Sequence, residues 1–303
     1  MNPACPCCGG TQARVVQRVN GGLLRALWRL QHGVRTGPIP TTTLHECGCG
    51  LRFFSPARAG DAAFYRAAYS HRSFRAWFSN PPEDHADFLA AIAHIRAGDR
   101  VLDVGGHGGA FARLMPRGAD CTVIDPYADE YAASDTLRET ACAHALARPG
   151  HYDVVCAFQV IEHVEDPGLL AREMMACLKP GGLLILAGPT WPSALTQIPN
   201  LAINAPPHHL TWWSPPAFEC FAARLGLDVL EARTVEGTAA LRRVYHWLAR
   251  LTPDVPADQP FRHSWWLHGR LVLAAALRPV LNAVLGCGPP GLFTDAFLVA
   301  RKP

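Results

Sequence analysis

Short apolar runs alternate with helical patterns over the larger, second part of the chain. The apolar runs cover residues 100–104, 121–124, 153–158, 183–187, 228–232 and 296–300. They are continuous rather than alternating in polarity, which is typical of strands that helices cover on both faces. The pattern therefore predicts an α/β fold with a mostly parallel sheet and helical crossovers.

Two crossover helices have marked starts. Asp166 before Pro167, and Ser214 before Pro215, each place an N-cap acceptor ahead of a proline at the first helical position. Ahead of the first strand, the segment 80–82 (Asn-Pro-Pro) is also typical of a helix start. Apolar residues follow it at helical spacing, and a glycine at position 98 is expected to end that helix.

A long insertion of roughly 60 residues separates the last two strands, far more than an ordinary connection needs. It contains two apolar helical segments, 241–251 and 265–285. Polar and helix-breaking residues interrupt the second segment and argue against a membrane span: His268, Arg270, Arg278 and Pro279. A lid, an oligomer contact and an interfacial helix with the pair Trp265-Trp266 all remain open.

Composition narrows the class of protein. The 303 residues are 49% hydrophobic and 17% charged, enough for a large core, and their number fits one catalytic domain with an appendage or two domains. The N-terminus lacks the basic and apolar regions of a secretion signal. The eleven cysteines do not form an evident disulfide framework, so we expect a reducing cytoplasm with metal-ligating or buried thiols.

Charge is uneven along the chain. The formal net charge is only +3, but residues 1–60 hold seven arginines and a single acid, Glu46. This basic segment is either a weak phosphate-facing patch or a solvated face. A nucleic-acid partner is not expected from so small a net charge.

The first strand runs into a glycine-rich turn at residues 105–109. Glycines let the backbone approach a ligand closely, and the helix that follows offers free N–H groups. The dinucleotide pattern Gly-x-Gly-x-x-Gly fits poorly, because its third position is Phe111. Asp125 ends the second strand, where a carboxylate can bind both ribose hydroxyls. Adenosine without a pyrophosphate fits both observations.

Five motifs in order and spacing resemble the class I S-adenosylmethionine-dependent methyltransferases, in the branch of small-molecule O- and C-methyltransferases. The motifs are Val101-Leu102-Asp103-Val104-Gly105, Ile124-Asp125-Pro126, Tyr152-Asp153-Val154-Val155, the run from Gln159 to Pro167, and Leu178-Lys179-Pro180-Gly181-Gly182. The resemblance implies a doubly wound, mostly parallel, seven-stranded Rossmann-like sheet. A Rossmann-like domain for another nucleotide is the alternative.

The resemblance also implies a set of cofactor-binding residues: Asp103, Gly105, Gly106, His107, Gly109, Asp125, Pro126, Phe158 and Gln159. The glycine-rich loop would surround the methionine portion, Asp125 would hold the ribose, and Phe158 with Gln159 would flank the sulfonium. Two positions depart from the family pattern. His107 replaces a glycine, and residues 141–145 offer no acid for the adenine amino group.

Methyl transfer to a hydroxyl needs a general base. The candidates are His163, which opens a helix after the fourth strand, and the pair His208-His209, which follows the fifth strand. We favour the pair, because that loop lies at the carboxyl ends of the strands. Packing or capping roles are the alternative for each histidine. Three residues ahead of the first strand could cover the cofactor or simply pack: Tyr65, Tyr69 and Arg72.

The N-terminal cysteines resemble the zinc ribbon found ahead of some of these enzymes. Cys5, Cys8 and Cys49 match its pattern, and Cys47 is the expected fourth ligand, with Cys7 and His45 as substitutes. Four such ligands suit structural, tetrahedral Zn²⁺. Reduced thiols or a degenerate ribbon are the alternatives.

The sequence thus predicts a cytoplasmic methyltransferase that acts on a small or carrier-linked acceptor. Oxygen is favoured over carbon as the atom that receives the methyl group. The alternatives are a noncatalytic binding module and an RNA methyltransferase. Membrane-surface contact is not favoured. The expected organisation is a zinc-ribbon-like segment (1–60), a helical lid or cap (61–98), a methyltransferase core (99–236), a helical insertion (237–292) and the last core strand (293–303).

Overall fold

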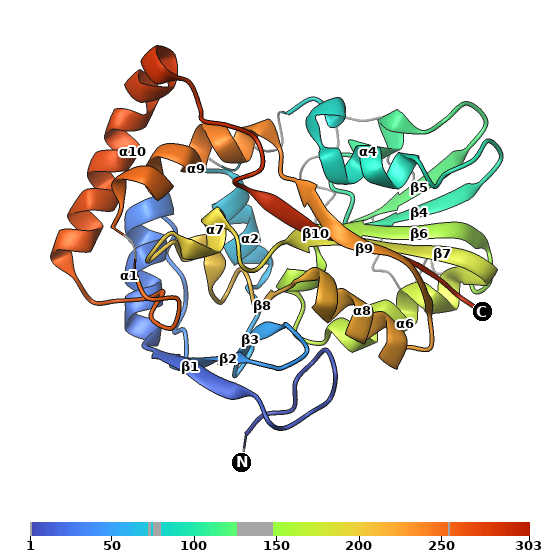
Figure 1. Ribbon diagram of the computed structural model, residues 1–303, viewed down its shortest axis with the longest axis horizontal. Coiled ribbons are helices and arrows are strands. Elements are labelled where there is room, and N and C mark those ends of the chain that lie inside the picture. Colours follow the sequence, from blue (N-terminus) through green and yellow to red (C-terminus); the bar gives the residue numbers. More distant parts are fainter. Residues whose placement is uncertain (1, 72–73, 75–79, 126–147, 254) are drawn as a thin grey trace.

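The computed structural model describes residues 2–71, 74, 80–125, 148–253 and 255–303. Its centre is a six-stranded sheet in the order β5-β4-β6-β7-β10-β9 (Figure 1). The strands of this sheet are β4 (Arg100–Val104), β5 (Asp120–Ile124), β6 (Tyr152–Phe158), β7 (Leu178–Pro189), β9 (Asp228–Glu236) and β10 (Thr294–Arg301).

The six-stranded sheet confirms the predicted α/β fold. Strands β5, β4, β6 and β7 pair in parallel, while β10 runs antiparallel to both β7 and β9. Each predicted apolar run falls within one of these strands. The count of seven strands stays a prediction, because residues 126–147, including the acid-free stretch 141–145, lie outside the described residues.

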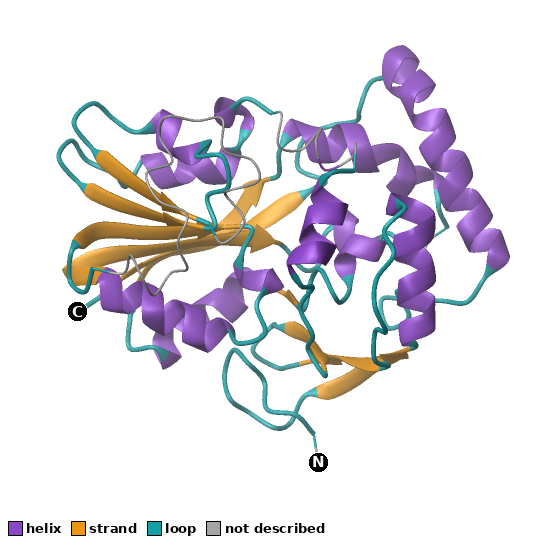
Figure 2. Cartoon of the chain, turned by 180° about the vertical axis from the view of Figure 1, so that it is seen from behind, coloured by secondary structure: helices purple, strands orange, loops and turns teal. Residues whose placement is uncertain are grey.

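Helices cover both faces of this sheet, which explains why the strands are apolar without alternation. Figure 2 shows helices on either side. One face carries α4 (Ala86–Ile92) and the short helix η2 (Phe111–Leu114), and the other carries α6 (Pro167–Cys177) and α8 (Pro215–Arg224). The predicted N-caps are confirmed: Asp166 Oδ1 accepts from the Leu169 amide at 2.9 Å, and Ser214 Oγ accepts from the Ala217 amide at 3.3 Å.

The helix predicted to start at Asn80 and end at Gly98 is wrong in its limits. Residues Pro82–Asp84 form a separate short helix, η1, and His85 has extended backbone angles before α4 begins. The helix α4 then ends at Ile92, six residues before Gly98. Gly98 has a φ of +89° and donates its amide to the Gly118 carbonyl, so it belongs to the turn that leads into β4.

A second, four-stranded sheet links the N-terminal segment to the rest of the chain. Its order is β1-β2-β3-β8, and β8 comes from the loop after β7. The elements around it are β1 (Arg14–Val19), α1 (Gly21–His32), β2 (Thr42–Glu46), β3 (Arg52–Ser55), α2 (Ala62–Tyr69), η4 (Ile161–His163), α7 (Ala194–Gln197), η5 (Ala202–Asn204) and β8 (Thr211–Trp212). One apolar cluster joins α1 with residues near η5 and with the later insertion. Because this cluster contains residues from several of the predicted units, the boundaries between those units stay predictions.

The insertion forms two helices that pack against each other, α9 (Ala239–Leu251) and α10 (Trp265–Leu285). Both agree with the helical segments predicted from the apolar pattern, and Pro279 lies inside α10. None of the helices in the described ranges is long and apolar enough to span a membrane.

Trp213 is a buried side chain that packs between β8 and α8. Its side chain is fully buried, stacks on Phe218 at a ring distance of 4.8 Å and donates its indole N–H to Thr211. We expect Trp213→Ala to lower the free energy of unfolding by about 3–5 kcal/mol, because it leaves a large cavity. The measurement is a urea unfolding curve. Trp266→Ala, at an exposed indole, is the control and should change little.

Candidate active site

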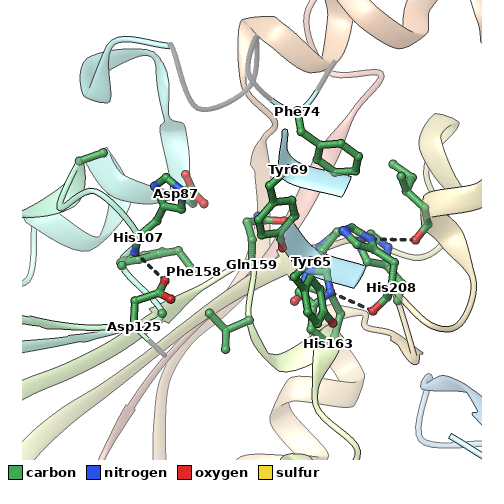
Figure 3. Close-up of a pocket in the computed structure, with 18 of the residues that line it drawn as sticks. Tyr65, Tyr69, Phe74, Asp87, His107, Asp125, Phe158, Gln159, His163 and His208 are labelled. Atoms are coloured by element: carbon green, nitrogen blue, oxygen red, sulfur yellow. Dashed lines mark hydrogen bonds and ion pairs between the residues drawn. The ribbon is translucent and has the colours of Figure 1, made fainter. Parts of the chain in front are cut away.

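A cavity of about 670 Å³ lies at the carboxyl ends of β4, β5 and β6. Side chains from α2, η4, α9 and the loop after β7 complete its walls (Figure 3). This position at the strand ends is where open α/β sheets bind ligands, and the volume suits a small-molecule site.

The turn after β4 forms one wall and requires its glycines. Gly105 has a φ of +75°, and a Cβ there would lie 2.4 Å from Val160 Cγ2. A Cβ on Gly106 would lie 2.2 Å from Asp103 Oδ2. Gly109, with a φ of +69°, shapes the same turn but does not line the cavity. The glycines thus let the turn pack closely on β4 and η4 while its backbone faces the cavity.

Asp125 faces this turn. Its Oδ2 accepts a hydrogen bond from the backbone amide of His107 at 2.9 Å, which ties the end of β5 to the turn after β4 (Figure 3). His107 has a φ of 46°, so histidine adopts the left-handed backbone that a glycine would otherwise provide here. Both residues line the cavity, whereas Pro126 lies outside the described residues.

The cavity is acidic. Five carboxyl side chains line its described part, against one arginine, Arg113; the acids are Asp87, Asp103, Asp125, Glu162 and Glu165. Burial raises the pKa of Asp103 to about 7, helped by the nearby Asp125, and burial raises the pKa of Glu162 to about 8. Asp103 Oδ2 and both carboxylate oxygens of Glu162 are buried and have no hydrogen-bond partner among the described residues. Such groups favour a cationic ligand.

Asp87 is a wall residue that the sequence analysis missed. It is buried on α4, and burial raises its pKa. The sequence offered one indication of this role: Asp87 is the one acidic residue in α4 and lies next to the apolar face of that helix. Glu162 was visible only as the neighbour of His163, and Tyr245, which reaches the cavity from α9, carried no recognisable signal.

Phe158 and Gln159 occupy the wall at the end of β6, as the resemblance implied. Phe158 packs against Phe88 and Phe111 at ring distances of 4.9 and 4.6 Å. Gln159 has a φ of 58°, and its side chain counteracts part of the rise that burial causes in the pKa values of Asp87 and Asp295. The left-handed backbone at Gln159 therefore turns the chain out of the sheet at the cavity.

The three candidate histidines come together in the same cavity. Their ring centroids are 4.4 Å apart for His163 and His208, 4.9 Å for His163 and His209, and 4.6 Å for His208 and His209. His163 Nδ1 donates to the His208 carbonyl at 2.8 Å, and His208 Nδ1 donates to the Ile203 carbonyl at 3.2 Å (Figure 3). These two bonds leave Nε2 as the basic nitrogen of His163 and of His208.

Burial keeps these imidazoles unprotonated. It lowers the pKa of His163 to about 4, and it lowers the pKa values of His208 and His209 well below the usual value. Repulsion among the three rings lowers the values for the His208-His209 pair further. Glu162 Oε1 lies 3.6 Å from His163 Nε2. The cluster can therefore accept a proton from a ligand at neutral pH.

Aromatic side chains line the cavity beside the histidines. Tyr65 and Tyr69 on α2 lie 6.3 Å from the His208 ring by centroid, and Phe74 lies 5.5 Å from it. The sequence-based expectation for Arg72 falls outside the described residues. The resulting chamber suits a planar or apolar ligand.

The four expected cysteine ligands also come together, apart from this cavity. The four Sγ atoms all lie within 4.8 Å of one another; they belong to Cys5, Cys8, Cys47 and Cys49. The sulfur of Cys7 instead donates to the Ala217 carbonyl at 3.1 Å, although it also lies near Cys49 and Cys220. His45, the other substitute, stacks on Phe53, and it lies outside this four-sulfur group.

The cysteine cluster is fixed to the core by polar contacts. Arg224 donates to the Cys7 carbonyl at 2.9 Å, and Ser214 Oγ donates to the Gly50 carbonyl at 3.0 Å. Gly50 has a φ of +91°, and a Cβ there would lie 2.6 Å from that hydroxyl. Glycine is therefore required where the second cysteine turn meets the N-terminus of α8.

Comparisons with known proteins agree with this arrangement. The curated relative from Pectobacterium carotovorum subsp. carotovorum (strain PC1), named "Ubiquinone biosynthesis O-methyltransferase", is 40% identical over 107 residues, 31% of this chain and 45% of that protein. The protein of the same name from Xanthomonas campestris pv. campestris (strain B100) is 35% identical over 113 residues, 33% of this chain and 47% of that protein. The chain thus spans less than half the length of these relatives.

Among solved structures, an S-adenosylmethionine-dependent methyltransferase from Archaeoglobus fulgidus has a TM-score of 0.48 and 19% identity, covering 76% of this chain and 98% of that one. The [4+2]-cyclase SpnF has a TM-score of 0.44 and 20% identity, covering 72% and 80%. Likenesses this low do not by themselves establish a family. The family described as "Methyltransferase domain", however, matches residues 69–232, which is more than half of the chain. On that match, the protein belongs to the methyltransferase-domain family.

Proposed function

We propose that the protein transfers a methyl group from S-adenosylmethionine to a hydroxyl group of a small or carrier-linked acceptor. The observation that carries the proposal is a cavity that joins buried carboxyl oxygens of Asp103 and Glu162, which accept no hydrogen bond from the described residues, to a cluster of neutral histidines. The acidic side suits a cationic methyl donor, and the histidine side suits removal of a hydroxyl proton. The name of the relatives, which are O-methyltransferases, supports oxygen as the acceptor atom.

The residues around the glycine turn fit the cofactor. Asp103 with Gly105, Gly106 and His107 would surround its methionine portion, in the turn that Gly109 helps to shape. When bound, S-adenosylmethionine supplies an activated methyl group on a positively charged sulfur. The buried carboxyls compensate that charge, and its arrival lowers their raised pKa values.

The remaining cofactor residues follow from their places at the strand ends. Asp125 would hold the ribose, because its carboxylate lines the cavity at the end of β5, beside the glycine turn. Phe158 and Gln159 would flank the sulfonium and exclude water from it. Pro126 is included among the cofactor-binding residues on the family pattern alone.

The histidine cluster would provide the base. His208 is the residue we place nearest the acceptor hydroxyl, because its Nε2 is buried without a hydrogen-bond partner in the described structure. Its Nδ1 bond to Ile203 fixes the ring and the tautomer. His163 and His209 pack on this ring and would share the proton.

The chamber walls restrict the acceptor. Tyr65, Tyr69, Phe74 and Tyr245 give it an aromatic lining that favours a planar or apolar molecule. We keep the cytoplasmic location as part of the proposal, and a nucleic-acid acceptor is not expected.

The cysteine cluster would hold structural Zn²⁺. The sulfurs of Cys5 and Cys49 are 3.7 Å apart, and those of Cys8 and Cys47 are 3.5 Å apart. A tetrahedral site with Zn–S bonds of about 2.3 Å has sulfurs about 3.8 Å apart, so the spacing suits the ion. With four protein ligands there is no open coordination position, which assigns the ion to holding the ribbon and not to catalysis.

Asp125→Asn tests the cofactor site. Asparagine keeps an oxygen for the His107 amide but loses the charge and one ribose acceptor, so we expect about tenfold weaker binding of S-adenosylmethionine. Isothermal titration measures it, with Asp228→Asn at the exposed start of β9 as the control. Absence of binding by the unchanged protein at millimolar cofactor would refute the proposal.

His208→Asn tests the base. The asparagine amide replaces the Nδ1 bond to Ile203 but cannot accept the proton, so kcat should fall about 10²- to 10⁴-fold while cofactor affinity is unchanged. The assay follows S-adenosylhomocysteine release with a panel of catechols and phenols. His246→Asn, at a buried histidine outside the cavity, is the control. Equal losses in both variants would argue against His208.

The same assay has a pH signature. Because the histidine pKa values are lowered, the base becomes protonated only in acid. His163 is protonated as the pH falls through about 4, and the pKa values of His208 and His209 also lie well below the usual histidine value. Because all three histidines stay unprotonated over this range, we expect that lowering the pH from 8 to 6 does not reduce kcat through loss of the base. A solvated histidine would instead give a decline below about pH 6.5.

Two cysteine variants test the zinc site. Elemental analysis of the purified full-length chain should find zinc, Cys8→Ser should lose most of it, and Cys7→Ser should keep it, because Cys7 is bonded to the Ala217 carbonyl. Equal zinc contents in the two variants would contradict this ligand set.

A further inference from the structure

The helix α10 exposes more apolar surface than any role within this chain explains. Only three of its 21 residues are buried: Leu267, Leu271 and Ala274. Its exposed large apolar side chains are Trp265, Trp266, Val272, Leu273, Leu277, Val280, Val284 and Leu285, from 42% exposed at Leu277 to 88% at Trp265. A helix that is apolar on all sides is normally buried.

Five of these exposed residues form one continuous stripe. Trp266, Leu273, Leu277, Val280 and Val284 follow one another at spacings of seven, four, three and four, which places them on one face, with Trp265 and Val272 on one flank of it. The buried residues lie beyond the other flank of the stripe, on the side that packs against α9. Figure 1 shows α10 at the outer edge of the molecule, remote from the six-stranded sheet. The stripe extends for about 30 Å, given a rise of about 1.5 Å per residue.

The charge on the two helices α9 and α10 is of one sign, whereas the segment between them contains Asp258. Neither α9 nor α10 contains an acidic residue, and together they hold five arginines. Arg270 is held beside the stripe: its guanidinium donates to the Leu251 carbonyl at 2.9 and 2.7 Å and lies 5.5 Å from the Trp266 ring centroid. Arg262, just ahead of α10, is exposed. The face thus combines an apolar stripe with flanking cations.

We propose that α10 is an interfacial helix that binds the surface of an anionic bilayer. Trp265 and Trp266 would enter the headgroup region with the aliphatic stripe, and Arg262 and Arg270 would face lipid phosphates. A second copy of the chain fits less well, because pairing this helix with itself would bring together two helices that carry arginines and no acids. The proposal does not depend on the methyl-transfer reaction.

The test is cosedimentation of the full-length protein with vesicles. We expect binding to phosphatidylcholine–phosphatidylglycerol vesicles, much weaker binding to pure phosphatidylcholine, and a decrease as salt is raised from 0.1 to 0.5 M. Trp265→Ser/Trp266→Ser should bind at least about tenfold more weakly. Leu30→Ser/Leu169→Ser, which changes exposed leucines on α1 and α6, is the matched control and should bind as the unchanged protein does.

Circular dichroism and light scattering complete the experiment. The tryptophan variant should keep the native spectrum and thermal midpoint, because both indoles are exposed. The proposal is overturned if the unchanged protein does not bind anionic vesicles, or if the control loses as much binding as the tryptophan variant. It is also overturned if the protein is a dimer that the tryptophan variant dissociates without any change in vesicle binding.

Discussion

The burial of carboxyl oxygens that accept no hydrogen bond from the described residues is the constraint on which this candidate active site depends. Asp103 and Glu162 lie in one cavity with oxygens that make no hydrogen bond in the described structure, and burial raises both pKa values. Such groups destabilise an empty protein unless they stay protonated. The arrangement is reasonable where a cationic ligand is bound, since the ligand supplies the charge that the chain leaves out.

The fold maintains this strained region by means of its rigid surroundings. Gly105 and Gly106 pack against Val160 and Asp103 with no room for a side chain, and Asp125 ties the turn to the neighbouring strand. His107 and Gln159, which both have left-handed backbone, line the same cavity after the neighbouring strands β4 and β6. Helices on both faces of the sheet hold the strand ends that carry these turns.

The N-terminal segment is part of this framework rather than a separate attachment. Its strand β3 pairs with β8, which precedes α8 and follows the histidine pair. The cysteine turns contact α8 through Ser214 and Arg224. A metal bound at the cysteines would therefore stabilise a surface that is continuous with the loop of His208 and His209.

Local patterns in the sequence determined the strands, the caps of α6 and α8, the glycine turn and the place of Asp125 at the end of β5, because each depends on neighbouring residues or on a spacing within one element. The meeting of His163 with His208, the approach of Asp87 and Tyr245 to the cavity, and the place of β10 between β7 and β9 were decided by tertiary structure. The exposure of α10 belongs with these, since its apolar pattern suits a buried helix equally well. Contacts between distant segments depend on how whole elements pack, and a residue's neighbours in sequence carry little information about that.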